Sequence, residues 1–233
     1  MRFKLAVSTP LALVLSVLCV DSATAQQTLN FSVGAFAVRG EDARVPGDVL
    51  IANRDVFLFD FNDFTSPSLT AEWLAPLGDY FEMGGGIGFA SRSVPTIYDA
   101  FVRPDGTEID QTLKLRTVPL SATVRVLPFG RNRAVQPYIG GGIGVTNWRY
   151  SETGDFVDFS QTGRPIFHDS YAASGWAVGP IAVFGARVPM GNFSLGGELR
   201  YQKAEGELDE RDFFGPKLDL GGFHYVATFG VRF

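Results

Sequence analysis

The sequence predicts an all-β chain that folds as an up-and-down transmembrane barrel of about eight antiparallel strands. Glycine and phenylalanine are abundant, with 27 and 21 residues among 233, while no segment sustains the periodicity of a helix. Several segments instead alternate apolar and polar residues with a period of two, as a strand with two different faces does. Short and long connections also alternate, as they do when tight turns line one rim of a membrane barrel and long loops the other.

The N-terminus is predicted to be a signal peptide that covers residues 1–25. Positive charge at Arg2 and Lys4 precedes an apolar run at residues 11–20, and the small residues 23–25 provide a cleavage site. A membrane anchor is the weaker interpretation, since no later segment approaches the roughly 18 to 20 apolar residues that a spanning helix needs.

The predicted mature chain, residues 26–233, is one barrel domain without cysteine. Cys19 is the only cysteine, and the bulky Leu18 before it departs from the pattern of a lipoprotein, so the thiol is expected to leave with the signal peptide. Neither disulfides nor thiolate-bound metals can then stabilise the fold, and we expect no cofactor. The mature chain has 18 basic and 24 acidic residues, and this negative charge argues against a nucleic-acid partner.

The last strand is the clearest, because its residues divide almost completely between an apolar and a polar face. Tyr225, Phe229 and Phe233 alternate with His224 and Arg232. Equivalent alternation predicts strands at residues 29–38, 69–75, 80–90, 118–127, 139–145, 176–188, 193–202 and 223–233.

Prolines and glycines modify this strand pattern. Pro119 and Pro180 each remove a backbone donor, so we expect bulges or local changes of register there. A Gly-Gly-Gly-Ile-Gly motif occurs at residues 84–88 and again at residues 140–144, which suggests a repeated hairpin. Neither copy opens a helix or ends in Gly-Lys-Ser/Thr, so we expect small residues facing a narrow lumen rather than a phosphate-binding loop.

The connections predict which rim carries the long loops. Three are short, at residues 75–79, 128–135 and 189–192, and four are long, at residues 40–67, 93–111, 151–173 and 203–216. An even number of strands places both termini on the periplasmic side, so the long loops are expected to be extracellular. The last of them offers an acidic surface to an extracellular partner, with carboxylates at Glu205, Glu207, Asp209, Glu210 and Asp212.

Charged residues within the predicted strands fall on the face opposite the aromatic residues. A membrane barrel needs apolar residues toward lipid, whereas its lumen can be polar because closure pairs every backbone group. A soluble barrel with an aromatic core is the alternative. Eight strands enclose a space that side chains can fill, so we predict an internal ion-pair network that plugs the lumen, with a narrow, gated ion path as the alternative. The network would comprise Glu72, Glu82, Arg125, Arg187, Glu198, Arg200 and Arg232.

The last strand and the segment PYIGGG at residues 137–142 resemble the OmpA-type small outer-membrane barrels of Gram-negative bacteria. The resemblance covers nearly the whole mature chain, and no peptidoglycan-binding domain is expected to follow the barrel. It implies a porin-like barrel of the cell envelope, in contact with outer-membrane lipid and lipopolysaccharide. It also implies a C-terminal signal for the barrel-assembly machinery, which here would consist of Tyr225, Phe229, Val231 and Phe233.

The sequence offers one weak candidate for catalysis, His168-Asp169-Ser170 on a predicted loop. Outer-membrane lipid-A deacylases and palmitoyltransferases look like barrels with a His and a Ser near the outer rim. Adjacent residues on a loop point in different directions, however, and Tyr171 stands where the deacylase pattern has asparagine. We therefore predict a solvated turn and no enzyme. His224 is predicted to be a hydrogen-bonded lumen residue, since no metal-ligating partner stands beside it.

The aromatic segment at residues 55–64 allows two interpretations, a strand extension beyond the membrane or an exposed apolar edge that binds a partner or a hydrophobic solute. The acidic loops could hold a divalent cation that bridges to lipopolysaccharide phosphates, although no calcium-loop spacing supports this. The predicted function is a structural or surface-interaction role with a mostly plugged lumen. A narrow conduit for small or hydrophobic solutes ranks second, and a lipid-A-modifying enzyme ranks third. Residue patterns alone identify no substrate, adhesion target or oligomeric state.

Overall fold

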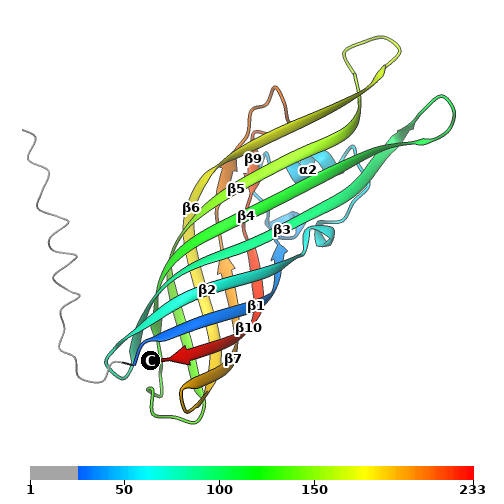
Figure 1. The fold of residues 1–233 in the computed structure, drawn as a ribbon. Helices are drawn as coiled ribbons and strands as arrows, with labels where there is room; N and C mark the ends of the chain where they lie inside the picture. The colour runs from blue at the N-terminus through cyan, green and yellow to red at the C-terminus, as the bar shows by residue number, and fades with distance from the viewer. Residues whose placement is uncertain (1–25) are drawn as a thin grey trace, which may run out of the picture.

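Eight long strands close into an antiparallel barrel (Figure 1). The computed structural model describes residues 26–233, so the predicted signal peptide lies outside the described residues. Neighbouring strands follow one another around the wall in chain order, and β1 completes the ring by pairing with β10. The eight strands are β1 (Thr28–Val38), β2 (Ser66–Leu77), β3 (Phe81–Val102), β4 (Glu108–Val126), β5 (Gln136–Val157), β6 (Ile166–Met190), β7 (Phe193–Gln202) and β10 (Gly222–Arg232). The all-β, eight-stranded, up-and-down fold expected from the sequence is thus confirmed.

Short elements between the long strands gather at one end of the barrel. The connection from β1 to β2 contains the helical turns η2 (Glu41–Ala43) and η3 (Phe61–Phe64) and the six-residue helix α2 (Val49–Arg54). The connection from β7 to β10 contains β8 (Glu205–Glu207) and β9 (Lys217–Asp219), which pair with each other. Within the described part of the chain, none of the helices has the length and apolar character to cross a membrane.

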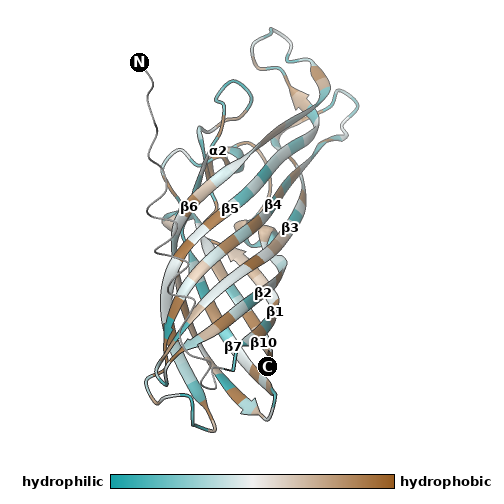
Figure 2. Cartoon of the chain, turned by 60° about the vertical axis from the view of Figure 1, so that its left-hand side comes forward, coloured by the Kyte–Doolittle hydropathy of each residue, from teal (hydrophilic) through white to brown (hydrophobic). Residues whose placement is uncertain are grey.

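The barrel wall around the lumen is apolar outside and charged inside. Phe31, Phe89 and Phe184 are exposed on the outer surface, whereas Glu72 and Arg125 are almost fully buried inside. Hydrophobic residues alternate with others along the wall strands in Figure 2. A soluble barrel would place its aromatic residues inside, so this arrangement excludes the soluble alternative and fits a wall that faces hydrocarbon.

The polarity of the two faces reverses where the strands continue past this apolar band. On the upper parts of β3, β4 and β5, Val94, Leu113 and Tyr150 are buried inside, while Lys114 and Arg149 are exposed outside. A barrel strand crosses a membrane with about 9–11 residues, but β3 to β6 have 22, 19, 22 and 25 residues. The excess forms two hairpins that project beyond the rim in Figure 1.

These projecting hairpins correct two of the predicted long loops. Residues 93–111 and 151–173 are mostly strand, and only residues 103–107 and 158–165 connect the strands of each hairpin. The expected pattern was apolar outside and polar inside, which holds only at the level of the membrane. Above that level water replaces lipid, so the same alternation continues with the opposite sense.

The register does not shift at either proline, contrary to the prediction, although the pairing of β3 with β4 is interrupted beside Pro119, between the pairs Ile87–Leu120 and Ala90–Thr117. Pro119 pairs with Thr146 within an uninterrupted register between β4 and β5. Pro180 lies on β6, where it pairs with Ile143 of β5 without a shift. On the other side, the pairing of β6 with β7 begins at the next residue. The Pro180 carbonyl accepts a hydrogen bond of 3.1 Å from the Lys203 amide, and the missing donor of the proline leaves this contact with one bond at the end of the ladder. The one register shift between β3 and β4 lies instead at residues 97–102, near the hairpin tip.

The aromatic segment at residues 55–64 is neither a strand extension nor an exposed edge. It enters the upper end of the barrel, where Phe57, Phe61 and Phe64 are buried. There the inward faces of the projecting strands are apolar, and aromatic side chains are needed to fill the space between them. Phe61 and Phe64 join a core with Leu113 and Leu218, one from a wall strand and one from β9. We call the structure formed by residues 39–65 and 203–221 the cap.

A glycine substitution can test the closeness of β4 and β5. A Cβ atom on Gly142 would overlap the carbonyl oxygen of Ala122 and lie 2.8 Å from Cα of Thr123, whereas a Cβ atom on Gly85 would meet nothing within 4 Å. We expect Gly142→Ala to lower the free energy of unfolding by about 1–3 kcal/mol through overpacking. The matched control Gly85→Ala should change it by less than about 0.5 kcal/mol. Urea unfolding in lipid vesicles, together with gel mobility before and after boiling, measures both, and equal effects would contradict this packing.

Candidate functional site

Four charged side chains form an ion-pair cluster across the lumen. Glu72 from β2, Arg125 from β4, and Glu198 and Arg200 from β7 all lie on inward positions of their strands. Arg125 pairs with both carboxylates, at 2.9 Å from Glu198. Arg200 lies 3.0 Å from Glu198 and 3.3 Å from Glu72. Each acid therefore contacts both cations, and the cluster connects strands on different sides of the barrel.

Hydrogen bonds from neighbouring side chains complete this cluster. The Tyr138 hydroxyl donates to Glu198 Oε2 over 2.9 Å, and the Arg125 guanidinium stacks over the Tyr138 ring at 4.8 Å from its centre. The Thr123 hydroxyl donates to Glu72 over 3.3 Å. Buried charges are costly unless they are paired and hydrogen-bonded. All four charges of this cluster are paired, whereas Arg125 Nε is buried without a hydrogen-bond partner among the described residues.

A second cluster lies nearer the rim with the short turns. Glu82 from β3 pairs with Arg187 from β6 and lies 3.6 Å from Arg131 of the turn between β4 and β5. Gln136 accepts a hydrogen bond of 2.9 Å from Arg187. Arg131 is absent from the predicted network, because sequence alternation does not place turn residues inside a barrel.

Arg232 is the one predicted lumen residue that forms no ion pair within residues 26–233. It lies half-buried near the C-terminus, at the same end of the barrel as Arg187 and Arg131. The structure therefore gathers six of the seven predicted residues into two clusters and leaves Arg232 apart.

His224 occupies the lumen above the four-residue cluster. Its Nδ1 atom lies 2.9 Å from the Ser68 hydroxyl, and its Nε2 atom lies 3.4 Å from the Gln202 side-chain oxygen. The Phe36 ring packs against it with a centroid separation of 4.6 Å. No group of three or more His, Cys, Asp or Glu side chains within the described residues could hold a metal ion.

A buried glutamate that sequence alternation did not reveal lies on a wall strand against the cap. Glu152 of β5 is 2% exposed, and its Oε1 atom accepts hydrogen bonds from Asn53 of α2 at 2.6 Å and from Tyr150 at 2.8 Å. Burial raises the pKa of Glu152, while these hydrogen bonds oppose the rise. No arginine, lysine or histidine forms an ion pair with this carboxylate among residues 26–233. Its position on the same face as Trp148 and Tyr150 was the available signal.

Two buried ion pairs hold the cap together. Arg44 pairs with Asp48, and Arg39 pairs with Asp219. The Asp219 backbone amide also donates to Asp48 over 2.8 Å, and the Val45 amide donates to Asp219 over 3.0 Å. Burial raises the pKa of Asp48, against the opposing effect of Arg44. These contacts connect the loop after β1 to the strand before β10.

An aromatic cleft of about 240 Å³ opens between the β5–β6 hairpin and the β8–β9 connection. Its walls carry Tyr98, Phe156, Tyr171 and Phe213, and Glu152 lies among its lining residues. The cleft thus offers aromatic rings and one buried carboxyl group to a molecule that reaches this rim.

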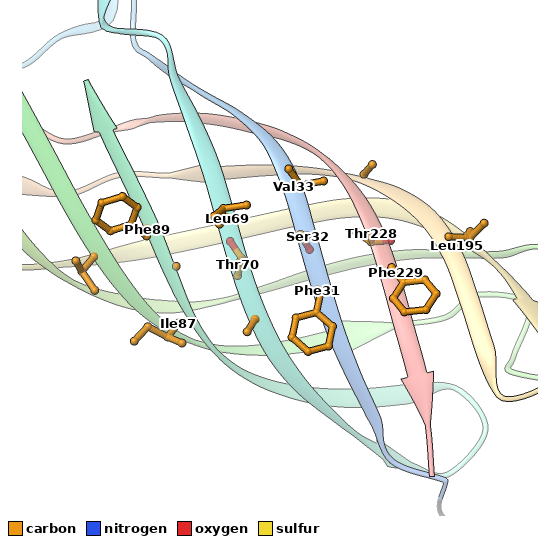
Figure 3. A pocket seen from close by; sticks show the side chains of 14 residues that line it. Phe31, Ser32, Val33, Leu69, Thr70, Ile87, Phe89, Leu195, Thr228 and Phe229 are labelled. Carbon is orange, nitrogen blue, oxygen red and sulfur yellow. The ribbon is translucent and has the colours of Figure 1, made fainter. Parts of the chain in front are cut away.

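A larger hollow of about 690 Å³ lies on the outer wall. Figure 3 shows large side chains around it, including Phe31, Leu69, Ile87 and Phe229. The small Ala71 side chain lines it as well. Its surface is almost wholly apolar and lies within the band that faces lipid, so in a bilayer it would contact acyl chains.

The candidate catalytic segment lies on strand β6, so the predicted turn was wrong. His168 is exposed and lies 2.7 Å from Asp155 of the neighbouring strand, rather than contacting Asp169. Ser170 lies 2.8 Å from the Thr153 hydroxyl and forms no hydrogen bond with the histidine. The three adjacent residues therefore form no proton relay.

The proposed assembly signal lies on the outward face of β10. Tyr225, Phe229 and Phe233 are exposed there, and Phe229 stacks on Phe193 of β7 at a centroid separation of 5.7 Å. The Phe233 amide donates to the Gln27 carbonyl over 3.0 Å, so the C-terminus is attached to the start of the barrel. Val231 is less exposed than its aromatic neighbours. Recognition by the assembly machinery stays a prediction.

Solved structures with a similar strand arrangement are outer-membrane proteins. A major outer membrane protein from Thermus thermophilus is 16% identical, with 91% of this chain and 100% of that chain covered at a TM-score of 0.49. Neisserial surface protein A is 12% identical, with the same coverage at a TM-score of 0.48. The attachment invasion locus protein Ail of Yersinia pestis is 13% identical, with 90% and 100% covered at 0.43. No protein-family model and no curated protein matches the chain. The assignment of the fold rests on the strand pairing described above.

Removing Arg125 tests how strongly the stability of the barrel depends on the balance of charges in the lumen. Arg125→Leu leaves Glu72 and Glu198 with one cation between them, and breaking a buried ion pair costs about 3–5 kcal/mol. We expect a loss of that size in the free energy of unfolding, measured by urea titration in lipid vesicles. The matched control Arg232→Leu removes an arginine without an ion pair and should cost less than about 1 kcal/mol. Similar losses for both variants would contradict the cluster's role.

Glu152 should make the stability of the cap depend on pH. The buried carboxyl has a raised pKa in the folded chain and its ordinary value of 4.5 in the unfolded chain. Between these two values the folded chain binds more protons, so the stability of the cap falls as the pH rises through that interval. Hydrogen-exchange protection of α2 amides, measured across this interval, should therefore decrease with rising pH.

A neutral variant isolates this contribution from that of Asp48, whose pKa is also raised. Glu152→Gln keeps an acceptor oxygen for Asn53 and cannot ionise, so protection of α2 should lose much of its pH dependence. Asp209→Asn is the control, because Asp209 is an exposed acid whose pKa is lowered to about 2 by hydrogen bonds from Arg211. An unchanged profile in Glu152→Gln would refute the assignment.

Proposed function

We propose that the chain is an outer-membrane barrel with a closed lumen that acts at the cell surface by presenting its cap and hairpins to a partner. The observation that carries this proposal is the pair of obstructions along the barrel axis. The cluster of Glu72, Arg125, Glu198 and Arg200 crosses the lumen, and the packed cap fills the barrel above it. A solute would have to displace both.

The free energy needed to separate the buried ion pairs favours a closed lumen over a gated ion path. An ion passing the cluster would compete with contacts that each acid already makes with two arginines. Separating these partners would expose buried charges without compensation, which is costly at low dielectric. Above the cluster, the core around Phe64 and Leu218 contains apolar side chains that offer an ion no ligands.

We also propose that the cap and the long hairpins face the cell exterior. The two ends of the described chain, residues 26 and 233, and the short turns lie at the opposite end of the barrel (Figure 1). Bacterial outer-membrane barrels place short turns in the periplasm and longer connections outside. This orientation would bring the aromatic cleft to the surface of the cell.

The surface offered to a partner is more structured than an acidic loop. Asp209 pairs with Arg211, and Glu205 lies 3.7 Å from Lys217 and 3.9 Å from Lys203. Nearby basic residues thus already neutralise part of the acidic loop, which weakens the case for a bridging divalent cation. This end also presents the two hairpins and the cleft lined by Tyr98, Phe156, Phe213 and others.

Single-channel recording in a planar bilayer tests the closed lumen. We expect no resolved current steps from the wild-type barrel. The variant Glu72→Ala/Arg125→Ala/Glu198→Ala/Arg200→Ala removes the obstructing side chains together with their charges, so it leaves no unpaired ion and should widen the lumen. Heat-dependent gel mobility checks that this variant still folds. Regular current steps from the wild type would favour the conduit instead, and release of acyl chains from lipid A would favour the enzyme.

A further inference from the structure

Three basic side chains gather on the outer face of the barrel, outside the lumen and the cap. Lys114 and Arg116 lie on β4, two positions apart and therefore on the same face. Arg149 of β5 pairs directly with Arg116 in the strand register. All three side chains are exposed. They line a groove of about 430 Å³ together with Phe89, Ser91 and Ser151.

Nothing in the described chain neutralises this group. None of the three side chains takes part in an ion pair or a side-chain hydrogen bond among residues 26–233. Their neighbours on the same face are uncharged, with Ser91 beside Arg116 on β3 and Ser174 beside Arg149 on β6. Like charges directly opposite each other on adjacent strands destabilise a sheet. The chain as a whole is negatively charged, yet no acidic side chain in the described part of the chain compensates this pair of arginines. An external anion would relieve the repulsion between them.

The position of the group defines what kind of anion can reach it. It lies at the level where the outer face changes from apolar to polar. The next outward positions toward the membrane are Val118 on β4 and Asn147 on β5, followed by Leu120 and Val145. Phe89 lines the groove at its apolar end. The groove therefore has an apolar end in the lipid-facing band and a cationic end directly above it.

We propose that Lys114, Arg116 and Arg149 bind the phosphate group of a phosphorylated lipid whose acyl chains lie against the apolar wall below. Guanidinium groups donate paired hydrogen bonds to phosphate oxygens, and a lysine adds a further charge. The nearby Ser91 and Ser151 hydroxyls are suitable additional donors. This step rests on the orientation given under Proposed function, which places the basic group at the outer leaflet. The lipid that fits this position is a glycolipid with phosphate on its sugar.

Native mass spectrometry of the detergent-solubilised, full mature barrel measures this binding directly. The probes are bisphosphorylated lipid A, lipid A without its phosphates, and inorganic phosphate as a competitor. We expect the wild-type barrel to retain the bisphosphorylated form and to lose most of its affinity when the phosphates are absent. Inorganic phosphate at millimolar concentration should not displace the lipid. Equal retention of both lipid forms, or full displacement by inorganic phosphate, would overturn a site for a phosphorylated lipid.

Charge-removing variants connect the binding to these side chains. Each cation near a membrane surface contributes about a fivefold gain in affinity for anionic lipid, so Arg116→Gln/Arg149→Gln should weaken binding roughly 25-fold. Arg133→Gln is the matched control, because Arg133 is an exposed arginine in a short turn at the opposite rim. Binding that is unchanged in the double variant, or equally weakened in the control, would contradict the assignment.

The stability of the lipid-free variants separates lipid binding from a purely structural role of the arginines, because the two roles predict opposite changes. Relief of repulsion between the facing arginines should make Arg116→Gln more resistant to urea than the wild type in a nonionic detergent. Added lipid A should stabilise the wild type more than the variant. A variant that is less stable than the wild type without lipid would show that the arginines serve the fold. Because none of these side chains faces the lumen, the bilayer recordings described above succeed or fail independently.

Discussion

The level at which the hydrocarbon of the bilayer ends governs the rest of this structure. Below it, strand β4 turns Leu120 and Val124 outward and Arg125 inward. Above it, the same strand turns Lys114 outward and Leu113 inward. The pairing of β4 with β5 thus continues without interruption from one solvent to the other, and only the kind of side chain on each face changes. The barrel needs closure at both levels, because an open edge would expose unpaired backbone groups to lipid.

The reversal divides the interior into two parts with different chemistry. In the lower part, arginines and glutamates fill the narrow space, and their pairing across the lumen offsets the cost of burying their charges. In the upper part, the cap buries apolar and aromatic side chains such as Leu50, Phe64 and Leu218, where the usual hydrophobic driving force operates because water surrounds the hairpins. Arg39, Arg44 and their acidic partners then fix the cap loops.

Sequence alternation predicted the wall well, because lipid imposes one rule on every strand at the same depth. The inward positions of Glu72, Arg125 and Glu198 followed from counting alternate residues. The projecting hairpins were missed because the rule inverts above the membrane, so Ser93 and Ser151 looked like loop residues. Glu152 shares the inward face of β5 with Trp148 and Tyr150, but it lies in a segment that was predicted to be a loop. The buried Phe57 belongs to a loop, and contacts between a loop and a distant strand leave no periodic trace in the sequence.

The ion pair between Arg39 and Asp219 joins residues that lie 180 positions apart along the chain. They become neighbours because β1 pairs with β10, and this pairing completes the ring. The cap can therefore reach its full set of contacts only on a finished barrel. The cap is thus a structure of the closed barrel, because its two segments meet only where β1 and β10 pair.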